Sequence, residues 1–288
     1  LILPALLYVL VFSYLSYPYM IIAFKHFNYK LGVFGSEWCG FKNFEFFLKS
    51  TNAPTVIRNT LVLNILFIVT GTLTSLVLAI LLNELRSRVF VRTAQTMMLF
   101  PHYISWVVVS YILLAIFSNK NGLANQLLNA LGMKSISWYT KADAWPTILV
   151  WMKIWKSAGM NAVIYLAAIT GIDESIYESA TIDGANRFQR IVSITVPLIM
   201  PTVCIMTLLA VGKIMNGDFG MIYALVGDQG ILYETTDVID TYVYRVLRQT
   251  GDPSQSMAIG LFQSLIGLVM VVGSNWIVKH TFHEGALF

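Results

Sequence analysis

Apolar runs of about 20 residues recur along the 288-residue chain, and they restrict its fold more than any other feature. The hydrocarbon core of a bilayer is about 30 Å thick, which a helix of about 20 residues can cross. Because no water inside that core satisfies backbone N–H and C=O groups, a spanning run must be helical or belong to a closed barrel. With 57% hydrophobic and 12% charged residues, and runs too long for barrel strands, the sequence predicts an all-α integral membrane protein.

Six runs are predicted to span the bilayer. They cover residues 1–24, 59–82, 96–117, 145–169, 197–226 and 257–278 within a single transmembrane domain, residues 1–288. An even number of spans places both chain ends on one side of the membrane, together with the links at 83–93 and 170–196. The first of these links carries Arg86, Arg88 and Arg92, and basic residues concentrate in short cytoplasmic loops. We therefore expect this side to be cytoplasmic, although the Lys and Arg count over all loops does not by itself set the orientation.

Several classes of function find no support in the sequence. The net charge of +4 is small and scattered, so no nucleic-acid partner is expected. Cys39 and Cys204 lie in a polar loop and an apolar run, which predicts two free thiols. His102 follows Pro101 without acidic or Cys neighbours at ligand spacing, so we interpret it as a structural residue at a helix kink. We expect no metal site and no catalytic residue.

Charged and amide side chains interrupt the fourth and fifth predicted spans. Lys153 and Lys156 share one helical face, and a lysine at the centre of a span costs about 2.5 to 3.5 kcal/mol, so such residues usually face a partner or a watery cavity. Alternatively, these charges neutralise one another or extend to the interface, and the tryptophans only pack against lipid or core. The candidate substrate path comprises Trp151, Lys153, Trp155, Lys156, Asn161, Lys213, Asn216 and Asp218.

The stretch from Glu178 to Pro201 is longer and more polar than a membrane turn requires. Asp173 is placed to cap a first short helix, and Asp183-Gly184 is predicted to break it, since glycine adopts the dihedrals that a turn needs. A second short helix is expected to follow, with Pro197 opening the fifth span. The excess of polar residues predicts a docking surface.

This stretch resembles the EAA loop of ABC-importer permeases. The resemblance rests on Glu178, Ala180, Asp183-Gly184-Ala185, Val196-Pro197 and Pro201; Ser179 and Val196 are mild departures from the family pattern. The segments WCGFKNFEFFL, RNTL and IWKSAGMNAVIYLAAI are similar to other parts of carbohydrate-type permeases. The stretches TTDVIDTYVYR and MAIGLFQS resemble the polygalacturonan or LplB-type subgroup of oligosaccharide permeases, so that the resemblance covers essentially the whole chain.

The resemblance implies the type I ABC importer permease fold, with six transmembrane helices and a cytoplasmic coupling loop at about 170–196. It assigns contacts with an ATP-binding subunit to Glu178, Ser179, Ala180, Asp183, Gly184, Ala185 and Arg187. It further implies a multi-pass subunit of a bacterial cytoplasmic membrane, paired with a second related permease, two ATP-binding subunits and an extracytoplasmic solute-binding protein that delivers an oligosaccharide.

The chain has no G-x-x-x-x-G-K-[ST] phosphate loop, so ATP and Mg are expected on the partner subunits, no cofactor on this chain, and no enzyme activity of its own. An ion- or proton-coupled secondary transporter is the alternative, and a membrane-embedded enzyme is a weaker one, because no nucleophile–base pair is visible. Whether the oligosaccharide is acidic or neutral stays open.

Overall fold

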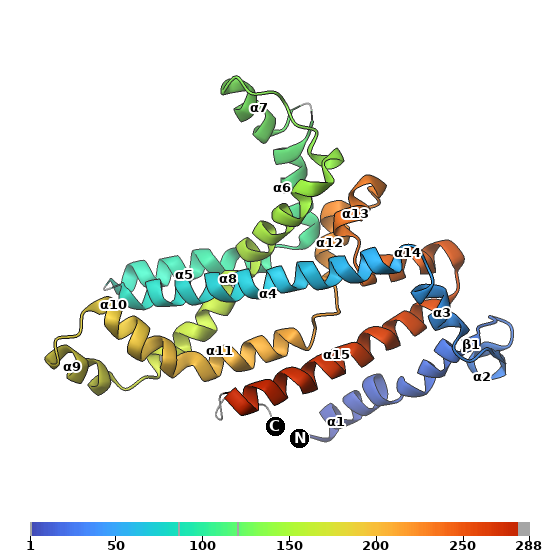
Figure 1. Cartoon of the computed structure of the whole chain (residues 1–288), viewed down its shortest axis with the longest axis horizontal. Helices are drawn as coiled ribbons and strands as arrows, with labels where there is room; N and C mark the ends of the chain where they lie inside the picture. The colour runs from blue at the N-terminus through green and yellow to red at the C-terminus, as the bar shows by residue number, and fades with distance from the viewer. Residues whose placement is uncertain (1, 86, 120, 282–288) are drawn as a thin grey trace.

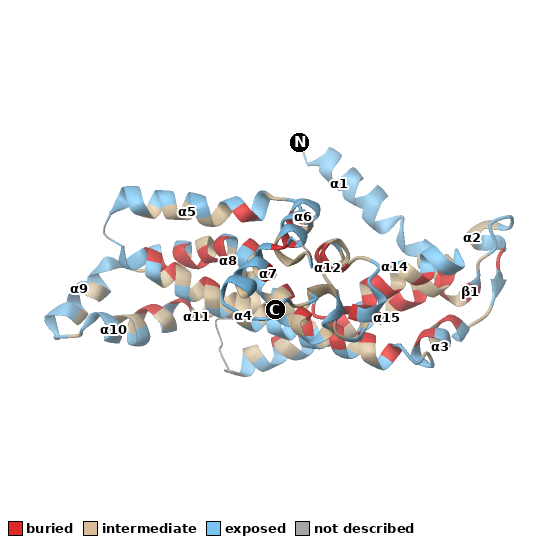
Figure 2. Ribbon diagram, turned by 90° about the horizontal axis from the view of Figure 1, so that it is seen from above, coloured by how far each residue is buried: buried red, intermediate tan, exposed pale blue. Residues whose placement is uncertain are grey.

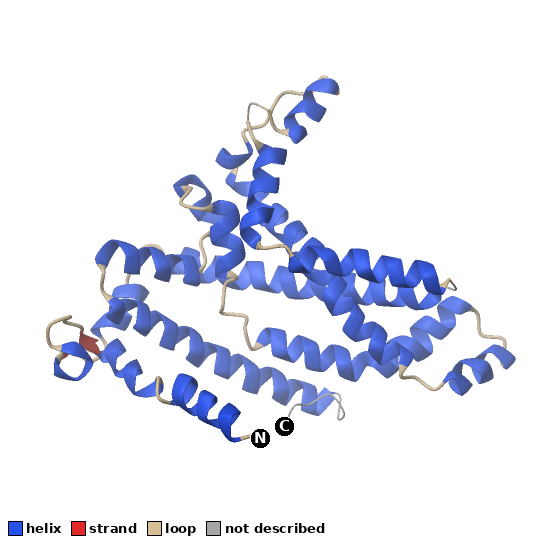
Figure 3. Ribbon diagram, turned by 180° about the vertical axis from the view of Figure 1, so that it is seen from behind, coloured by secondary structure: helices blue, strands red, loops and turns tan. Residues whose placement is uncertain are grey.

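The computed structural model of the chain describes residues 2–85, 87–119 and 121–281, so that Arg86 of the basic link lies outside the described residues. The regular structure of the described residues is helical, apart from one antiparallel pair of two-residue strands, which Figure 3 shows at one corner of the molecule. Figure 1 shows the long helices α4, α5, α11 and α15 extending along the long axis of the molecule, with α8 running obliquely across α4 and α5. The prediction of an all-α chain is confirmed.

The N-terminal half contains two long helices and several short elements. In chain order these are α1 Leu3–Val9, η1 Leu10–Tyr14, η2 Tyr17–Phe24, β1 Lys25–His26, α2 Gly32–Gly35, β2 Glu37–Trp38, α3 Lys42–Leu48, α4 Ala53–Glu84, α5 Arg88–Tyr103, α6 Trp106–Phe117, α7 Leu123–Ala130, η3 Trp138–Thr140 and η4 Ala142–Ala144. Here η1 is a π-helical turn, whereas η2, η3 and η4 are 3₁₀ helices. Strand β1 pairs with β2 in the register Lys25 opposite Trp38.

The C-terminal half begins with the crossing helix. Its elements are α8 Trp145–Thr170, α9 Glu174–Ile182, α10 Arg187–Arg190, the π-helical turn η5 Ile191–Thr195, α11 Val196–Val211, α12 Phe219–Val226, the 3₁₀ helix η6 Gly230–Leu232, α13 Tyr233–Thr236, α14 Ile239–Thr250 and α15 Pro253–Thr281.

Four helical stretches of the described chain are long and apolar enough to cross a bilayer. These are Leu3–Phe24, Ala53–Glu84, Arg187–Val211 and Pro253–His280, and the bent pair α5 and α6 makes a fifth if it is counted as one span. Helix α8 has 26 residues but carries two lysines and is not among the four. The chain is thus a multi-pass helical protein, while the number of six spans remains a prediction.

The expected third span, residues 96–117, is not one straight helix. Helices α5 and α6 meet at 95° across the break between Tyr103 and Trp106. Pro101 lies inside the last turn of α5, where it lacks an N–H, and the Ser105 side chain caps α6 by accepting from the Val108 amide at 3.3 Å. The proline and the new cap together turn the chain.

The expected fifth span, residues 197–226, also differs. Its helix begins before Pro197, because α10, η5 and α11 form one continuous stretch. A proline ring in a helix projects toward the preceding turn, and that turn is the π-helical η5, which widens the helix there. The helix then ends at Val211, and residues 212–218 are largely irregular. At Gly217 an added Cβ would lie 2.4 Å from the Val238 side chain, so only glycine permits this close approach.

Small residues allow the central helices to pack closely. Ser75 and Ala79 of α4 and Ala158 and Ala162 of α8 are all buried where these two helices cross. At Gly159 an added Cβ would lie 2.1 Å from the Met98 carbonyl oxygen of α5. The three helices α4, α5 and α8 therefore form a close-packed unit that fixes the positions of the polar groups described below.

The first half of the first span, by contrast, packs little against the rest of the chain, whereas its second half, η2, packs against α15. Every described residue of Leu3–Tyr14 is exposed, and Figure 2 shows α1 pale blue and inclined away from the body. The loop after this span does pack, since Phe47 of α3 is buried against Tyr242 and Phe262.

Candidate functional site

Two short helices, α9 and α10, form the polar stretch that the sequence singled out, and both are capped by side chains. The Asp173 carboxylate accepts from the Ser175 amide at 3.0 Å, as predicted. Asn186 and Gln189 form a reciprocal capping box, with bonds of 2.9 and 2.8 Å between each side chain and the other residue's amide. Each helix therefore starts at a defined residue, although α10 is only four residues long.

The turn between them is a Schellman motif. Gly184 has φ +82, the Ala185 amide donates to the Ala180 carbonyl at 2.9 Å, and the Gly184 amide donates to the Thr181 carbonyl at 3.1 Å. The predicted break at Asp183-Gly184 is thus confirmed in position and in cause. Glycine is required because a side chain is strained at this dihedral.

Apolar side chains project into solvent beside this turn. Ile182 is 87% exposed and Phe188 is 73% exposed. Ala180 and Ala185 are half-buried at the bend, whereas the other predicted contact residues, Glu178, Ser179, Asp183, Gly184 and Arg187, are exposed. Two large apolar side chains on a polar loop mark a surface that a partner protein is expected to cover.

Side-chain bonds fasten this surface to a long helix. The Tyr177 hydroxyl lies 2.9 Å from the Thr195 hydroxyl, which belongs to η5, the π-helical turn that directly precedes α11. Arg190 Nη1 donates to the Thr181 hydroxyl at 3.0 Å, joining α10 to α9. The loop and the helix that continues into α11 are therefore bonded at two points.

Lys156 is buried at the break between α5 and α6. Its Nζ donates to the carbonyl oxygens of Pro101 at 3.2 Å and of His102 at 2.7 Å, and also to that of Ile104. The last carbonyls of a helix have no intrahelical partner, and a nearby cation satisfies them. The ammonium group also lies 5.2 Å from the ring centre of Trp106. All its hydrogen bonds are therefore used within the chain.

Lys153, one turn earlier, forms an ion pair with Asp218. The two charged atoms are 2.8 Å apart, and the side chains are 30% and 28% exposed. The second carboxylate oxygen of Asp218 accepts from the Met221 amide at 3.1 Å and so caps α12. The pair joins α8 to the end of the irregular segment at 212–218. For Lys153 and Asp218 this agrees with the alternative prediction that the charges in the spans neutralise one another.

The remaining candidate path residues do not form one cluster. Trp151 lines an apolar crevice of about 400 Å³ at the start of α8, whereas Trp155 lines another, of about 280 Å³, against α5. Lys213 and Asn216 are exposed on the irregular segment, and Asn161 is half-buried in α8.

Three residues that sequence reasoning missed hold the irregular segment. Asn64 of α4 donates to the carbonyls of Ile214 at 2.9 Å and Asn216 at 3.1 Å. Gln263 of α15 donates to the Met215 carbonyl at 3.0 Å, and Asp240 of α14 accepts from the Gly217 amide. Backbone groups released by a broken helix need such partners away from water. The signal in the sequence that could have identified Asn64 and Gln263 is an isolated amide side chain within an apolar run.

Burial raises the pKa of the Asp240 carboxyl, although bonds from the Gly217 amide and Gln263 act in the opposite direction. Because an acid whose pKa is raised on folding binds more protons when folded, this group favours folding most below its unfolded pKa and loses that effect as pH rises.

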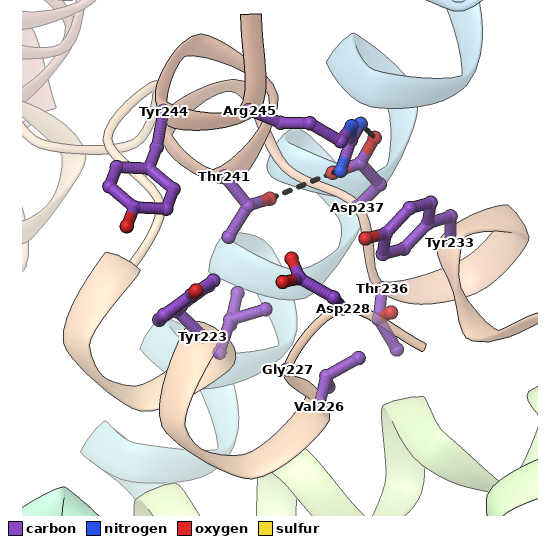
Figure 4. Close-up of a pocket in the computed structure, with 11 residues that line it drawn as sticks. Tyr223, Val226, Gly227, Asp228, Tyr233, Thr236, Asp237, Thr241, Tyr244 and Arg245 are labelled. Atoms are coloured by element: carbon purple, nitrogen blue, oxygen red, sulfur yellow. Dashed lines mark hydrogen bonds and ion pairs between the residues drawn. The ribbon is translucent and has the colours of Figure 1, made fainter. Parts of the chain in front are cut away.

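An ionic cluster ties the connection after α12 to α14, as Figure 4 shows. Asp237 pairs with Arg245 and accepts from the Thr241 hydroxyl at 2.8 Å, and the guanidinium lies 4.2 Å from the Tyr233 ring centre. The crevice among these residues encloses only about 10 Å³, roughly the space of one water molecule. It is therefore too small for a sugar, and the cluster serves to hold the loops.

The paired charges lead to a first prediction. Lys153→Met is expected to lower the free energy of unfolding by about 1 to 3 kcal/mol, because Asp218 is left partly buried without its partner. Asp218→Asn, which keeps an acceptor for the α12 cap, is expected to restore most of this stability in the double variant. Thermal unfolding in detergent measures both effects. Unchanged stability of Lys153→Met, together with a raised KM for uptake, would instead indicate a free substrate-binding lysine.

The chain is similar to transport proteins over nearly its full length. Residues 71–282 match the family described as "Binding-protein-dependent transport system inner membrane component". Protein LplB of Bacillus subtilis (strain 168) is 36% identical over 285 residues, which are 99% of this chain and 89% of the relative. The polygalacturonan/rhamnogalacturonan transport system permease protein YteP of the same organism is 33% identical, over 99% of this chain and 88% of the relative.

A solved structure has the same fold. A bacterial ABC transporter involved in the import of the acidic polysaccharide alginate matches with a TM-score of 0.89 and 32% identity, over 97% of this chain and 94% of the matched chain. The same kind of transporter, solved with its alginate pentasaccharide-bound periplasmic protein, matches with a TM-score of 0.88 and 32% identity, over 97% and 92% of the two chains. The predicted resemblance to oligosaccharide permeases is confirmed.

Proposed function

The chain belongs to the family of binding-protein-dependent transport system inner membrane components, and on that premise we propose that it is one transmembrane subunit of an ATP-driven oligosaccharide importer. The observation that carries the proposal is the exposed, capped pair α9 and α10, bonded to the long helix that continues into α11. A permease without its own nucleotide site needs a surface that receives force from an ATPase, and this pair supplies one.

The proposed assembly contains a second, related permease, two ATP-binding subunits that hold ATP and Mg, and an extracytoplasmic solute-binding protein, in a bacterial cytoplasmic membrane. Six spans, with α8 and the bent pair α5 and α6 each crossing once, place α9 and α10 on the side of the ATPases. Closure of the nucleotide-binding subunits moves α9, and the Tyr177–Thr195 and Arg190–Thr181 bonds carry that movement to α11.

In the proposed mechanism the irregular segment at 212–218 lies along the substrate path. Non-helical backbone at membrane depth is tolerated where it is enclosed by protein or lines a watery cavity. Lys213 and Asn216 are exposed on this segment and offer an ammonium group and an amide, which suit the hydroxyl or carboxylate groups of a sugar. Lys153 and Lys156 are engaged within the chain and position α12 and α6 instead.

An acidic oligosaccharide is the more specific candidate for the substrate. The relative YteP is named for polygalacturonan and rhamnogalacturonan transport, and the matched solved structure imports alginate. Lys213 is the candidate path lysine whose ammonium group is not engaged by the described part of the chain. A neutral sugar would not need that charge.

Uptake into proteoliposomes tests the proposal. The complete importer, with its ATPases inside the vesicle and its binding protein outside, is expected to accumulate labelled oligogalacturonides or oligoalginates only with ATP, and vanadate is expected to stop this uptake. Neutral oligosaccharides of equal length are the comparison. Uptake driven by an ion gradient without ATP would contradict the proposal and favour the alternative secondary transporter, while preferential uptake of the neutral sugars would overturn only the acidic class.

A further inference from the structure

Helix α7, in the loop between α6 and α8, exposes leucine side chains on its surface and buries the side chain of Asn125 against the rest of the loop. Leu123, Leu127 and Leu131 follow one another at four-residue intervals at and just beyond this helix and are 57%, 66% and 75% exposed. Asn125 is buried: its amide donates to the Ile136 carbonyl at 2.9 Å and its oxygen accepts from the Ile136 amide at 2.9 Å. A helix facing water would have the opposite arrangement.

The opposite face of α7 is polar. Asn129 is exposed about 200° around the helix from Leu127, and its side-chain oxygen accepts from the Ser135 hydroxyl at 3.0 Å. Gln126 is exposed beside it. The helix therefore has two distinct sides, a polar one that is fastened to the loop through Asn125 and Asn129, and one made of leucine.

The position of α7 places it near the bilayer surface. It begins six residues after Phe117, the last residue of the very apolar α6, so the connecting chain spans at most about 20 Å. In Figure 1, α7 lies at the tip of the projection formed by α6 and the start of α8, far from α9 and on the opposite side of the molecule from the marked chain ends. The helix is therefore on the side away from the proposed ATPase surface.

The surroundings of α7 have the composition of a membrane interface. Trp138, which is half-buried, packs on Phe117 with ring centres 4.9 Å apart. Aromatic residues of this kind concentrate where apolar chains meet lipid headgroups. Lys134 and Lys141 are exposed in the same loop, against a single exposed acid, Asp143, so that the loop complements phosphate groups.

We infer that α7 is an amphipathic anchor that lies in the outer headgroup layer and inserts Leu123, Leu127 and Leu131 between lipid chains. The chemistry of the stripe selects lipid over protein as its occupant. The three exposed side chains of this stripe are all leucine. The core of a protein interface is instead enriched in aromatic residues, methionine and arginine. The anchor holds the loop between α6 and α8 at one depth while the helices below it move.

A spin label on Leu127→Cys tests this inference in the assembled importer, reconstituted in nanodiscs of phosphatidylglycerol and phosphatidylethanolamine. The substitutions Cys39→Ala and Cys204→Ser are introduced first, because both residues are free thiols that would also be labelled. The label at residue 127 is expected to collide more often with dissolved oxygen, which partitions into lipid, than with a water-soluble nickel chelate. The matched label on Asn129→Cys, two residues away, is expected to show the reverse preference.

Either of two other results would overturn the inference. Equal access of the nickel chelate to both labels would mean that α7 stands in water. Protection of residue 127 from both reagents would mean that a protein, such as the second permease, covers the leucines. Because Leu127 is exposed, its replacement is not expected to impair folding, and the measurement does not depend on which solute is transported.

Discussion

Gly184→Glu is expected to abolish ATP-driven uptake and the substrate-stimulated part of the ATPase activity, while the chain still inserts and assembles with the second permease. Two effects combine at this residue. A side chain at φ +82 costs about 1 to 2 kcal/mol, which disturbs the Schellman turn, and a carboxylate is introduced where the partner ATPase is proposed to approach the backbone. Asp183→Arg, which reverses the adjacent charge, is expected to have the same consequence. Uptake and ATPase assays in proteoliposomes measure both.

The chain provides a matched control for the backbone strain. Gly251 also has positive φ, +65, at the end of α14, and an added Cβ would meet no atom within 4 Å at either glycine. Gly251→Glu therefore imposes a similar strain at a residue that the proposed topology places on the opposite side of the membrane, and it is expected to leave coupling intact. If Gly251→Glu uncoupled the importer as fully as Gly184→Glu, or if Gly184→Glu left coupling unchanged, the assignment of α9 and α10 as the ATPase-docking surface would be wrong.

Lys156→Met is expected to be the most destabilising substitution in the transmembrane region. It removes the donor shared by the carbonyls of Pro101, His102 and Ile104, and each buried carbonyl left without a partner costs about 1 to 3 kcal/mol. We expect a loss of at least about 2 kcal/mol in the free energy of unfolding, because three carbonyls lose their donor together. The thermal unfolding midpoint in detergent, without any sugar, measures it.

The same substitution at Lys213 is the control. Lys213 is exposed on the irregular segment, and exposed substitutions usually change stability by less than about 0.5 kcal/mol. Lys213→Met should therefore keep the unfolding midpoint but lower uptake of acidic oligosaccharides if this lysine lines the path. The reverse outcome, a stable Lys156→Met variant with a raised KM, would return Lys156 to the substrate path.

The local features of the chain could be predicted from the sequence. The cap at Asp173, the break at Asp183-Gly184 and the extent of α8 depend on residues within a few positions of one another. Backbone preferences such as the positive φ of Gly184 act over the same short range. For these reasons the sequence predicts the cap and the break of the polar loop correctly, whereas the helix that runs through Pro197 instead of starting there was not predicted.

The kinks and the roles of the charged residues could not be predicted in this way. A lysine in an apolar run is compatible with a substrate path, an ion pair or a cap on helix carbonyls, because the local sequence is the same in all three cases. Lys156 caps α5 only because α8 brings it to a break 52 to 55 positions earlier in the chain. Asn64 and Gln263 likewise acquire their partners from a segment 48 or more positions away.

The sequence alone therefore determined that this chain is a helical membrane protein with a polar loop broken at a glycine, since apolar length and turn chemistry are properties of contiguous residues. Only the tertiary structure decided which intramembrane charges are engaged within the chain, where the spans break, and that α7 directs its leucines outward. Those features depend on which backbone groups and helix faces are brought together across the fold, and a contact between distant residues leaves no local pattern in the sequence.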